Sequence, residues 1–249
     1  MTQADQPLIK RTFDVAVSAT ALLMLSPLLV LVTLAVWLQD FHSPFYIPLR
    51  AARGGGTFRM VKFRSMTVGA DRTGVDSTSA SDSRITPIGR LIRAGKLDEL
   101  VQLWNVLLGH MSIVGPRPQV MREVALYTEE EQGLLAVAPG ITDLASIVFA
   151  DEGEILRDKD DPDLAYHQLI RPWKSRLGLL YVRHSSIWLD VECVVLTAIA
   201  LMSRPAALRG VARVLQRLGA EGTLIQVARR NGPLLPAPPP GTDAIVSHR

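Results

Sequence analysis

Residues 91–118 read LIRAGKLDELVQLWNVLLGHMSIVGPRP and place two adjacent carboxylates, Asp98 and Glu99, directly before an apolar helix-like run. The stretch closes on Arg117, which stands between two prolines. Three cations precede the acid pair: Arg90, Arg93 and Lys96. Cations neutralise phosphate oxygens, and a carboxylate attacks phosphorus or binds a metal ion. We therefore predict that the fold is organised around this stretch and that the stretch handles phosphate.

The composition suits a membrane-associated domain. The 249 residues are enough for one sizeable domain with appendages. Hydrophobic residues make up 48% and charged residues 20%, with a mean hydropathy of +0.20, so part of the surface is expected to face lipid. The net charge of +3, the pI of about 9.2 and the arginine clusters suit an anionic surface or ligand. The single Cys193 excludes an internal disulfide and favours the reducing cytoplasm.

An uncharged run of 25 residues, 15–39, is long enough to span a bilayer as a helix, which takes about 20 residues. Ser26 and Pro27 stand at its midpoint, and proline removes a backbone donor, so the helix must kink or break there. We expect the Ser26 hydroxyl to bond the carbonyl of Leu22. The arm before the break is about 18 Å long, too short to cross roughly 30 Å of hydrocarbon.

The pattern leaves two topologies open for this run. A kinked helix spans the membrane, or two half-helices enter and leave on the same side. Cations at both ends favour cytoplasmic ends: Lys10, Arg11, Arg50 and Arg53. Pro-kinked spans are common, however, and the pattern alone favours the ordinary span. A cleaved signal peptide is not expected, because Asp14 lies in the entry and no small-residue cleavage site follows.

Residues 58–66, FRMVKFRSM, predict a strand that carries Lys62 and Arg64 on one side. Two cations side by side would clamp a diphosphate. The alternative, favoured by this segment alone, is a solvated basic edge. Residues 68–83 are rich in Gly, Ser, Thr and Asp and predict a surface loop, with Arg84 just beyond it.

The acid pair has a structural and a chemical interpretation. Asp98 is a suitable N-cap for a helix over residues 99–108, with Glu99 as a favourable first-turn charge. If Arg93 lies close, it lowers the pKa of Asp98 and makes an ionised nucleophile or metal ligand. Arg117 sits on a stiff, extended segment and loses little freedom on binding phosphate; the alternative is an exposed arginine in a rigid turn.

The middle of the chain gives weaker signals. Residues 121–136 predict an acid-rich amphipathic surface helix, and residues 141–149 predict a strand. Residues 151–163 hold seven acids but lack the glycine and spacing of an EF-hand, so a solvated loop is expected.

The C-terminal part predicts two helices and a tail. Residues 186–202 are apolar and are expected on a membrane or in a core. Residues 206–218 have an apolar and an arginine-rich face, which suits anionic lipid. Residues 233–249 are proline-rich and are expected to be disordered.

Several motifs together resemble the bacterial sugar transferases, the small monotopic phosphoglycosyl transferases that act on polyprenyl phosphate. The resemblance runs from about Lys10 to about Met202, and the motifs fall in the right order. They are KFRSM (62–66), RIT (84–86), LDEL (97–100), QLWNVLLGHMSIVGPRP (102–118) and PGIT (139–142). The Lys-Arg-x-x-Asp entry and the Ser26-Pro27 break also resemble that family.

The resemblance implies transfer of a sugar 1-phosphate from a UDP-sugar to undecaprenyl phosphate, with release of UMP and a requirement for Mg²⁺, as the first membrane step of exopolysaccharide, capsule or O-antigen synthesis. It implies a re-entrant N-terminal helix with both ends cytoplasmic, which reverses the preference for a span. The protein would be monotopic, on the cytoplasmic face of the bacterial inner membrane.

The resemblance also implies residue roles. Asp98 would be the nucleophile that forms a covalent phosphosugar intermediate, and Glu99 would complete the acid dyad at the magnesium ion. The phosphate-binding cations would be Arg93, Arg117, Lys62, Arg64 and Arg84.

The chain departs from the usual family pattern at several positions: Lys96 for Ser, Val101 for Pro, His110 for Asp, Ala51-Ala52 for Val-Gly, and Asp143 to Ser146 for Gly-x-Ala-Gln. The catalytic set is unchanged. The changes near Asp143 bear on sugar or nucleotide preference.

Taken together, we predict an α/β, mostly helical fold with a re-entrant membrane helix-hairpin, a small cytoplasmic catalytic domain and interfacial amphipathic helices. The expected domains are residues 1–45, 46–203 and 204–249. A membrane-associated UDP-sugar hydrolase and a non-catalytic lipid-binding scaffold are the alternatives. We expect no nucleic-acid partner. The sequence does not identify the sugar, the glycan pathway or the oligomeric state, for which a homodimer is one option.

Overall fold

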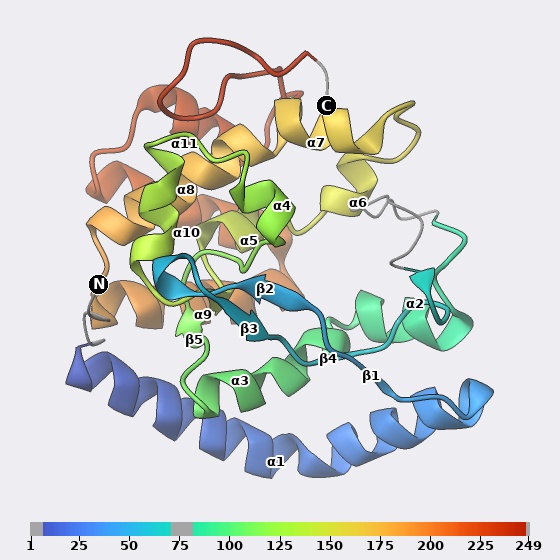
Figure 1. The fold of residues 1–249 in the computed structure, drawn as a ribbon. Coiled ribbons are helices and arrows are strands. Elements are labelled where there is room, and N and C mark those ends of the chain that lie inside the picture. Colours follow the sequence, from blue (N-terminus) through green and yellow to red (C-terminus); the bar gives the residue numbers. More distant parts are fainter. Residues whose placement is uncertain (1–6, 71–81, 248–249) are drawn as a thin grey trace.

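The computed structural model describes residues 7–70 and 82–247, and these are mostly helical (Figure 1). Residues 1–6 and most of the expected loop 68–83 lie outside the described residues. The strands are β1 (Phe45–Tyr46), β2 (Leu49–Ala51), β3 (Thr57–Arg59), β4 (Lys62–Phe63), β5 (Ser112–Val114) and β6 (Gly140–Thr142). The helices up to residue 136 are α1 (Leu8–Asp40), η1 (Arg53–Gly55), α2 (Pro87–Ala94), η3 (Leu97–Gln102), α3 (Leu103–Leu107), α4 (Met121–Val124) and η4 (Glu131–Ala136). They are followed by α5 (Leu144–Val148), α6 (Glu152–Ile155), α7 (Pro162–Leu169), α8 (Arg171–Arg183), α9 (Ile187–Met202), α10 (Arg204–Arg217) and α11 (Gly222–Arg229).

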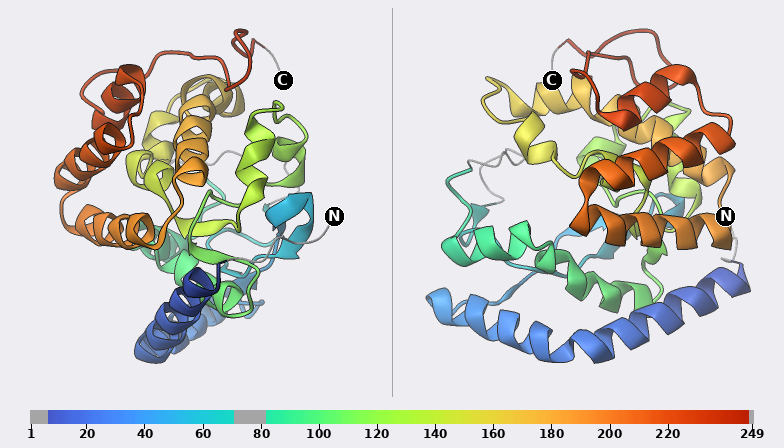
Figure 2. Two further views of the ribbon diagram at one scale, coloured as in Figure 1. Left: turned by 90° about the vertical axis from the view of Figure 1, so that its left-hand side faces the viewer. Right: turned by 180° about the vertical axis from the view of Figure 1, so that it is seen from behind.

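Helix α1 runs along one whole side of the molecule and bends in its middle, away from the other elements (Figures 1 and 2). Pro27 lies inside the helix, which continues through it as one element of 33 residues. The Ser26 hydroxyl donates to the carbonyl of Leu23 at 2.8 Å, not to that of Leu22. The reason is that Pro27 has no N–H, and the carbonyl left without its helical partner is the one four residues back, at Leu23.

Both ends of α1 are tied to the rest of the fold by polar side chains. Near its start, Lys10 donates to the carbonyl of Val114 at 3.1 Å and pairs with Asp190 at 2.6 Å. At its end, Asp40 pairs with Arg64 at 2.5 Å. One domain therefore holds the two ends of the same helix.

The outward face of α1 between these ends is apolar and exposed. Leu23 and Met24 are 77% and 75% exposed, whereas Val32 and Val36 are buried in a small cluster with Ile92 of α2. Within residues 7–70 and 82–247, α1 is the helix that is long and apolar enough to cross a membrane. The length and the apolar character of α1 would suit contact with lipid along the exposed face.

The expected strand over residues 58–66 is interrupted. In the described residues the strands form separate pairs, with β2 antiparallel to β3, β1 antiparallel to β4, and β5 parallel to β6. Asn105 of α3 inserts between β3 and β4, accepting from Val61 N at 2.8 Å and donating to the Arg59 carbonyl at 2.8 Å. The side-chain amide thus takes the place of a strand partner for residues 59–61. The predicted alternation across Lys62 and Arg64 does not hold either, because β4 ends at Phe63.

Three further predictions for the middle of the chain differ from the structure. The predicted helix over residues 121–136 is only α4 and η4, separated by a turn. The predicted strand over residues 141–149 is β6 followed by α5, because Asp143 caps a helix there by accepting from Ser146 N at 2.6 Å. The acidic segment 151–163 is also not a simple loop, since it contains α6 and the start of α7.

Helices α9, α10 and α11 stack side by side on the face behind the strands (Figure 2, right). The apolar face of α10 is fully buried at Ala207, Val211 and Leu215, in the same core as Leu144 of α5. The interpretation that this face meets lipid is therefore wrong: protein covers it. The apolar stripe of α9, in contrast, divides between the core and exposed residues such as Met202.

The proline-rich tail has no helix or strand through residue 247, yet it packs on the helices α7 and α8. The backbone N–H of Ala237 donates to the Gln168 carbonyl at 3.0 Å, and Arg176 donates to the Pro238 carbonyl at 2.9 Å. This differs from the expected disorder, because an N–H group and a carbonyl group of the tail are hydrogen-bonded to the two helices.

Candidate functional site

The acid pair lies in the first turn of η3, directly after a left-handed residue. Lys96 has φ 55°, which ends the α2 segment and redirects the chain into the 3₁₀ turn. Asp98 makes no side-chain cap hydrogen bond, and the helix predicted over residues 99–108 is split between η3 and α3. The N-cap interpretation of Asp98 is therefore wrong.

Glu99 is fully engaged by cations. Arg117 donates from Nη1 to Oε2 at 3.1 Å and from Nη2 to Oε1, and Lys62 donates to Oε1 at 3.4 Å. Burial alone would raise the pKa of Glu99, but Arg117 and Lys62 outweigh it and hold that pKa well below its usual range. Glu99 is thus a fixed, ionised carboxylate.

Asp98 is different, since its carboxylate has no hydrogen bond or ion pair among the residues that the structure describes. Burial raises its pKa above the ordinary 3.8; Lys62 acts against this rise, and so do Arg93 and Arg117. The expectation that cations lower this pKa is right for the sign of their effect and wrong for the net result, because desolvation is larger. Asp98 remains a half-buried carboxylate with free oxygens.

The structure brings Lys62, Arg93 and Arg117 into the electrostatic environment of Asp98. It places the other two predicted cations elsewhere. Arg64 donates to both carboxylate oxygens of Asp40 and to the Ser43 carbonyl, so it holds the end of α1. Arg84 binds the Asp82 carboxylate and the Ala70 carbonyl, and so holds the start of the loop.

A polar pocket with a volume of about 130 Å³ adjoins the acid pair through Lys62 and Arg117. It contains functional candidates that the sequence reasoning did not select: Arg50, Gln102 and Lys174. Gln102 is 1% exposed. The sequence signal for Gln102 was a polar residue at a buried position of an apolar run. Lys174 gave no such signal, because it comes from α8, far away in the sequence.

An apolar pocket continues from the polar one on the other side of Arg117. Its walls include Asp143 and Ser146, where the sequence departs from the family pattern. Burial raises the pKa of Asp143. The departure therefore lies at a cavity that shares a wall with the acid-pair site.

The acid pair is compatible with magnesium. The described residues hold no group of three or more acidic, His or Cys side chains, so an all-protein cage is not formed there. Magnesium typically takes one or two carboxylates and completes its shell with water and substrate phosphates. Asp98, with unbonded oxygens, and Glu99 match that donor set.

A family model for bacterial sugar transferases matches residues 5–204. The chain is 35% identical over 192 residues to a UDP-glucose:undecaprenyl-phosphate glucose-1-phosphate transferase of Klebsiella pneumoniae, covering 76% of this chain and 39% of that protein. It is 41% identical over 195 residues to an undecaprenyl-phosphate glucose phosphotransferase of Komagataeibacter xylinus, covering 76% and 35%.

A third relative is the exopolysaccharide production protein ExoY of Sinorhizobium fredii, 39% identical over 153 residues, covering 55% of this chain and 68% of that protein. The aligned parts thus cover less than two fifths of the first two relatives. Most of α10, together with α11 and the tail, lies beyond the end of the family match.

Proposed function

Because this chain belongs to the bacterial sugar transferase family, we propose that it transfers a sugar 1-phosphate from a UDP-sugar to undecaprenyl phosphate and releases UMP. The relatives' names make UDP-glucose the first donor to test and place the step in glycoconjugate synthesis, such as that of exopolysaccharide. Within the proposal, the partners are the nucleotide donor, the lipid acceptor and the membrane.

The contrast between the two adjacent carboxylates carries the proposal. Glu99 is held by Arg117 and Lys62, which neutralise its charge and make it a weaker nucleophile than Asp98, although its oxygens keep lone pairs for a metal ion. Asp98 has free oxygens beside the same cations. Phosphoryl transfer depends mainly on positioning and on neutralising charge, and this arrangement supplies both to one carboxylate.

In the first step, an Asp98 carboxylate oxygen attacks the phosphorus that carries the sugar. The bond from that phosphorus to the bridging oxygen of the donor breaks, and UMP leaves with the bond's electron pair. In the second step, a phosphate oxygen of the lipid attacks the same phosphorus and displaces Asp98. The product is the lipid diphosphate sugar, and the carboxylate is regenerated. Arg117, Lys62 and Arg93 would hold the phosphate oxygens in both steps.

Magnesium is part of the proposal, held by Asp98 and Glu99. When bound, it would neutralise negative charge on the diphosphate.

We also propose that the protein is monotopic on the cytoplasmic face of the inner membrane, with α1 entering and leaving on that side. Two contacts support this: Lys10 and Asp40, near opposite ends of α1, both pair with side chains of the same domain. A helix that spanned the bilayer would carry its two ends to opposite sides. The exposed apolar face of α1 supplies the surface for lipid.

The topology gives a prediction. Tags placed at Met1 and directly after Arg50 are both expected to react with impermeant reagents only from the cytoplasmic side, because the domain holds both ends of the helix. Accessibility labelling of spheroplasts and inverted vesicles measures this. A Met1 tag that is labelled in intact spheroplasts would show a spanning helix.

A second prediction concerns pH. Asp98 must be ionised to attack, and its pKa is raised by burial and pulled down by Lys62, so kcat/KM should fall as pH decreases through a pKa above 3.8. Lys62→Met removes that cation, raises the pKa further and should move the acidic limb to higher pH. A pH series of kcat/KM measures the shift. The control is Arg59→Met, an exposed cation of the preceding strand β3, and a limb unchanged in Lys62→Met would contradict the argument.

The function itself is tested with purified protein, undecaprenyl phosphate and a panel of UDP-sugars. We expect UMP and lipid-linked sugar diphosphate in equal amounts. Release of free sugar phosphate at a rate that ignores the lipid would show a hydrolase instead, and the absence of any donor turnover would favour a scaffold.

A further inference from the structure

The polar and apolar pockets form one continuous groove. The two pockets share six lining residues: Arg117, Pro118, Gln119, Glu123, Tyr166 and Lys174. The groove they form runs from the polar end, which holds Lys62, to the apolar end, which holds Leu134 and Leu135. It is thus longer than the site of a single phosphate.

The polar end of the groove has an excess of cations. Four cations line it, namely Arg50, Lys62, Arg117 and Lys174. Glu152 binds Lys174, and Glu99 binds Lys62 and Arg117, but Arg50 has no ion pair among the described residues. The Arg50 Nε and the Gln102 Nε2 groups are buried donors without a hydrogen-bond partner among the described residues. Leaving a buried donor unpaired costs about 1–3 kcal/mol, so this end is built for an anionic acceptor.

The other end of the groove has an apolar lining. Leu134, Leu135 and Val137 form one part of the wall, and Tyr127 and Tyr166 add two aromatic side chains. Such a lining suits a flat heterocycle, which stacks on aromatic rings and fills apolar space. A phosphate would be poorly solvated there.

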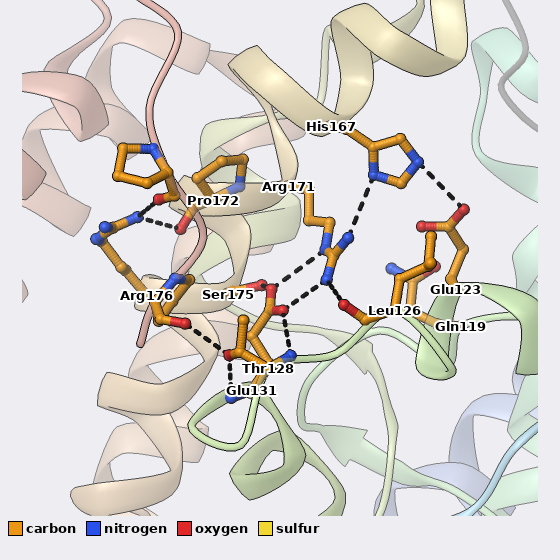
Figure 3. A network of polar contacts seen from close by, with 12 residues as sticks. Gln119, Glu123, Leu126, Thr128, Glu131, His167, Arg171, Pro172, Ser175 and Arg176 are labelled. Carbon is orange, nitrogen blue, oxygen red and sulfur yellow. Dashed lines mark hydrogen bonds and ion pairs between the residues drawn. The ribbon is translucent and has the colours of Figure 1, made fainter. Parts of the chain in front are cut away.

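Arg171 lines the apolar pocket but is not available to a ligand. Figure 3 shows its guanidinium held by Glu131, with further contacts to the Leu126 carbonyl and to His167. Glu131 is fully buried and also accepts from Ser175 at 2.6 Å. The network is therefore closed, and it makes the wall rigid rather than cationic.

The middle of the groove presents a carboxylate. Glu123 lies at the boundary of both pockets, where His167 Nε2 is 3.6 Å from its Oε1 atom (Figure 3). A carboxylate accepts hydrogen bonds from ribose hydroxyls in other nucleotide-binding folds. From one end to the other, the groove thus offers donors for phosphate, an acceptor for hydroxyls and an apolar slot.

Resting on the function proposed above, we propose that this groove binds the nucleoside monophosphate half of the donor, with the phosphate at Arg50 and Gln102, the ribose beside Glu123 and the base in the apolar pocket. Asp98 then stands at the phosphate end, next to the bond that breaks, and the sugar extends away from the groove.

The test measures binding to the full chain in detergent or nanodiscs, with two probes. UMP is titrated by calorimetry, and inorganic phosphate by ³¹P NMR, which detects weak binding. Arg50→Met removes the phosphate contact, and Leu135→Trp fills the base pocket. Matched controls are Arg59→Met in the same hairpin and Leu235→Trp on the exposed tail. If Leu135→Trp fails to fold, judged by thermal unfolding, Leu135→Phe replaces it.

We expect Arg50→Met to weaken both probes by roughly 10- to 100-fold, the worth of one charge-assisted hydrogen bond or more. Leu135→Trp should weaken UMP by about tenfold or more and leave phosphate binding unchanged, because only the base loses its place. An unchanged UMP affinity in either variant, or equal losses for both probes in Leu135→Trp, would overturn the assignment.

These measurements separate the inference from the proposed function. If the variants behave as expected and no sugar phosphate is transferred to lipid, the transferase proposal fails and the groove assignment stands. If transfer occurs and both variants bind UMP as the wild-type protein does, only the groove assignment fails.

Discussion

Replacing Asp98 by asparagine is expected to reduce sugar phosphate transfer by roughly 10⁴-fold or more, the size of loss seen when a residue that acts as nucleophile is removed. Asparagine is nearly isosteric but is a poor nucleophile toward phosphorus. The carboxylate has no hydrogen bond within the described residues, so its loss breaks no contact of the fold. UMP release and lipid product formation measure the effect, and the unfolding temperature should stay close to that of the wild-type protein.

Two controls sharpen this result. Asp160→Asn changes an exposed acid of the loop before α7 and should leave turnover unchanged. Incubation of the wild-type protein with UDP-sugar alone should leave a sugar phosphate on residue 98, detectable by mass spectrometry of peptides. If Asp98→Asn retains more than a small fraction of activity, or if the label falls on Glu99, the assignment of the nucleophile is wrong.

Replacing Lys10 by methionine is expected to cost about 3–5 kcal/mol of folding free energy, because it leaves a buried carboxylate without its cation. Asp190 is fully buried and accepts from Lys10 at 2.6 Å and from Tyr181 at 2.6 Å. For a chain of this length the melting temperature should fall by roughly 6–20 °C. Thermal unfolding in detergent measures it.

The double variant Lys10→Met with Asp190→Asn provides the internal control, since it removes the stranded charge as well. It should recover a large part of the lost stability, because the penalty comes from the unpaired ion. Lys159→Met, an exposed lysine, should have no effect. A melting temperature of Lys10→Met equal to that of the wild-type protein would mean that the pair does not stabilise the attachment of α1.

The sequence pattern identified the acid pair and three of its cations because they lie within or beside short motifs, and the structure places them together. It failed for the position of Arg64, because the alternation argument assumed a strand that continues past Lys62, whereas β4 ends at Phe63 and Arg64 binds Asp40 at the end of α1. It missed the net pKa shift of Asp98 because burial depends on the folded chain. It found the apolar face of residues 206–218, but amphipathicity alone does not tell whether lipid or protein covers that face.

The region after Gly140 shows the same limit at the scale of one element. Ile147 and Val148 are β-branched, and their propensity favoured a strand. A single cap by Asp143, together with burial of Leu144, Ala145, Ile147 and Val148, makes it a helix instead. The preference of these residues for a strand, about 1 kcal/mol per residue, is outweighed by the free energy of tertiary packing.

The attachment of α1 at Lys10 and at Asp40 has a consequence for how the lipid acceptor would reach the site. A helix of 33 residues is about 50 Å long. Because both of its ends are bound to the domain, α1 cannot move relative to the membrane independently of the domain. Under the proposed topology, the acid pair stays at a fixed height above the membrane surface. The isoprenoid chain of the acceptor would then stay in the bilayer, and only its phosphate head group would enter the site. The second substrate would therefore arrive by lateral diffusion in the membrane and would not have to be extracted from it.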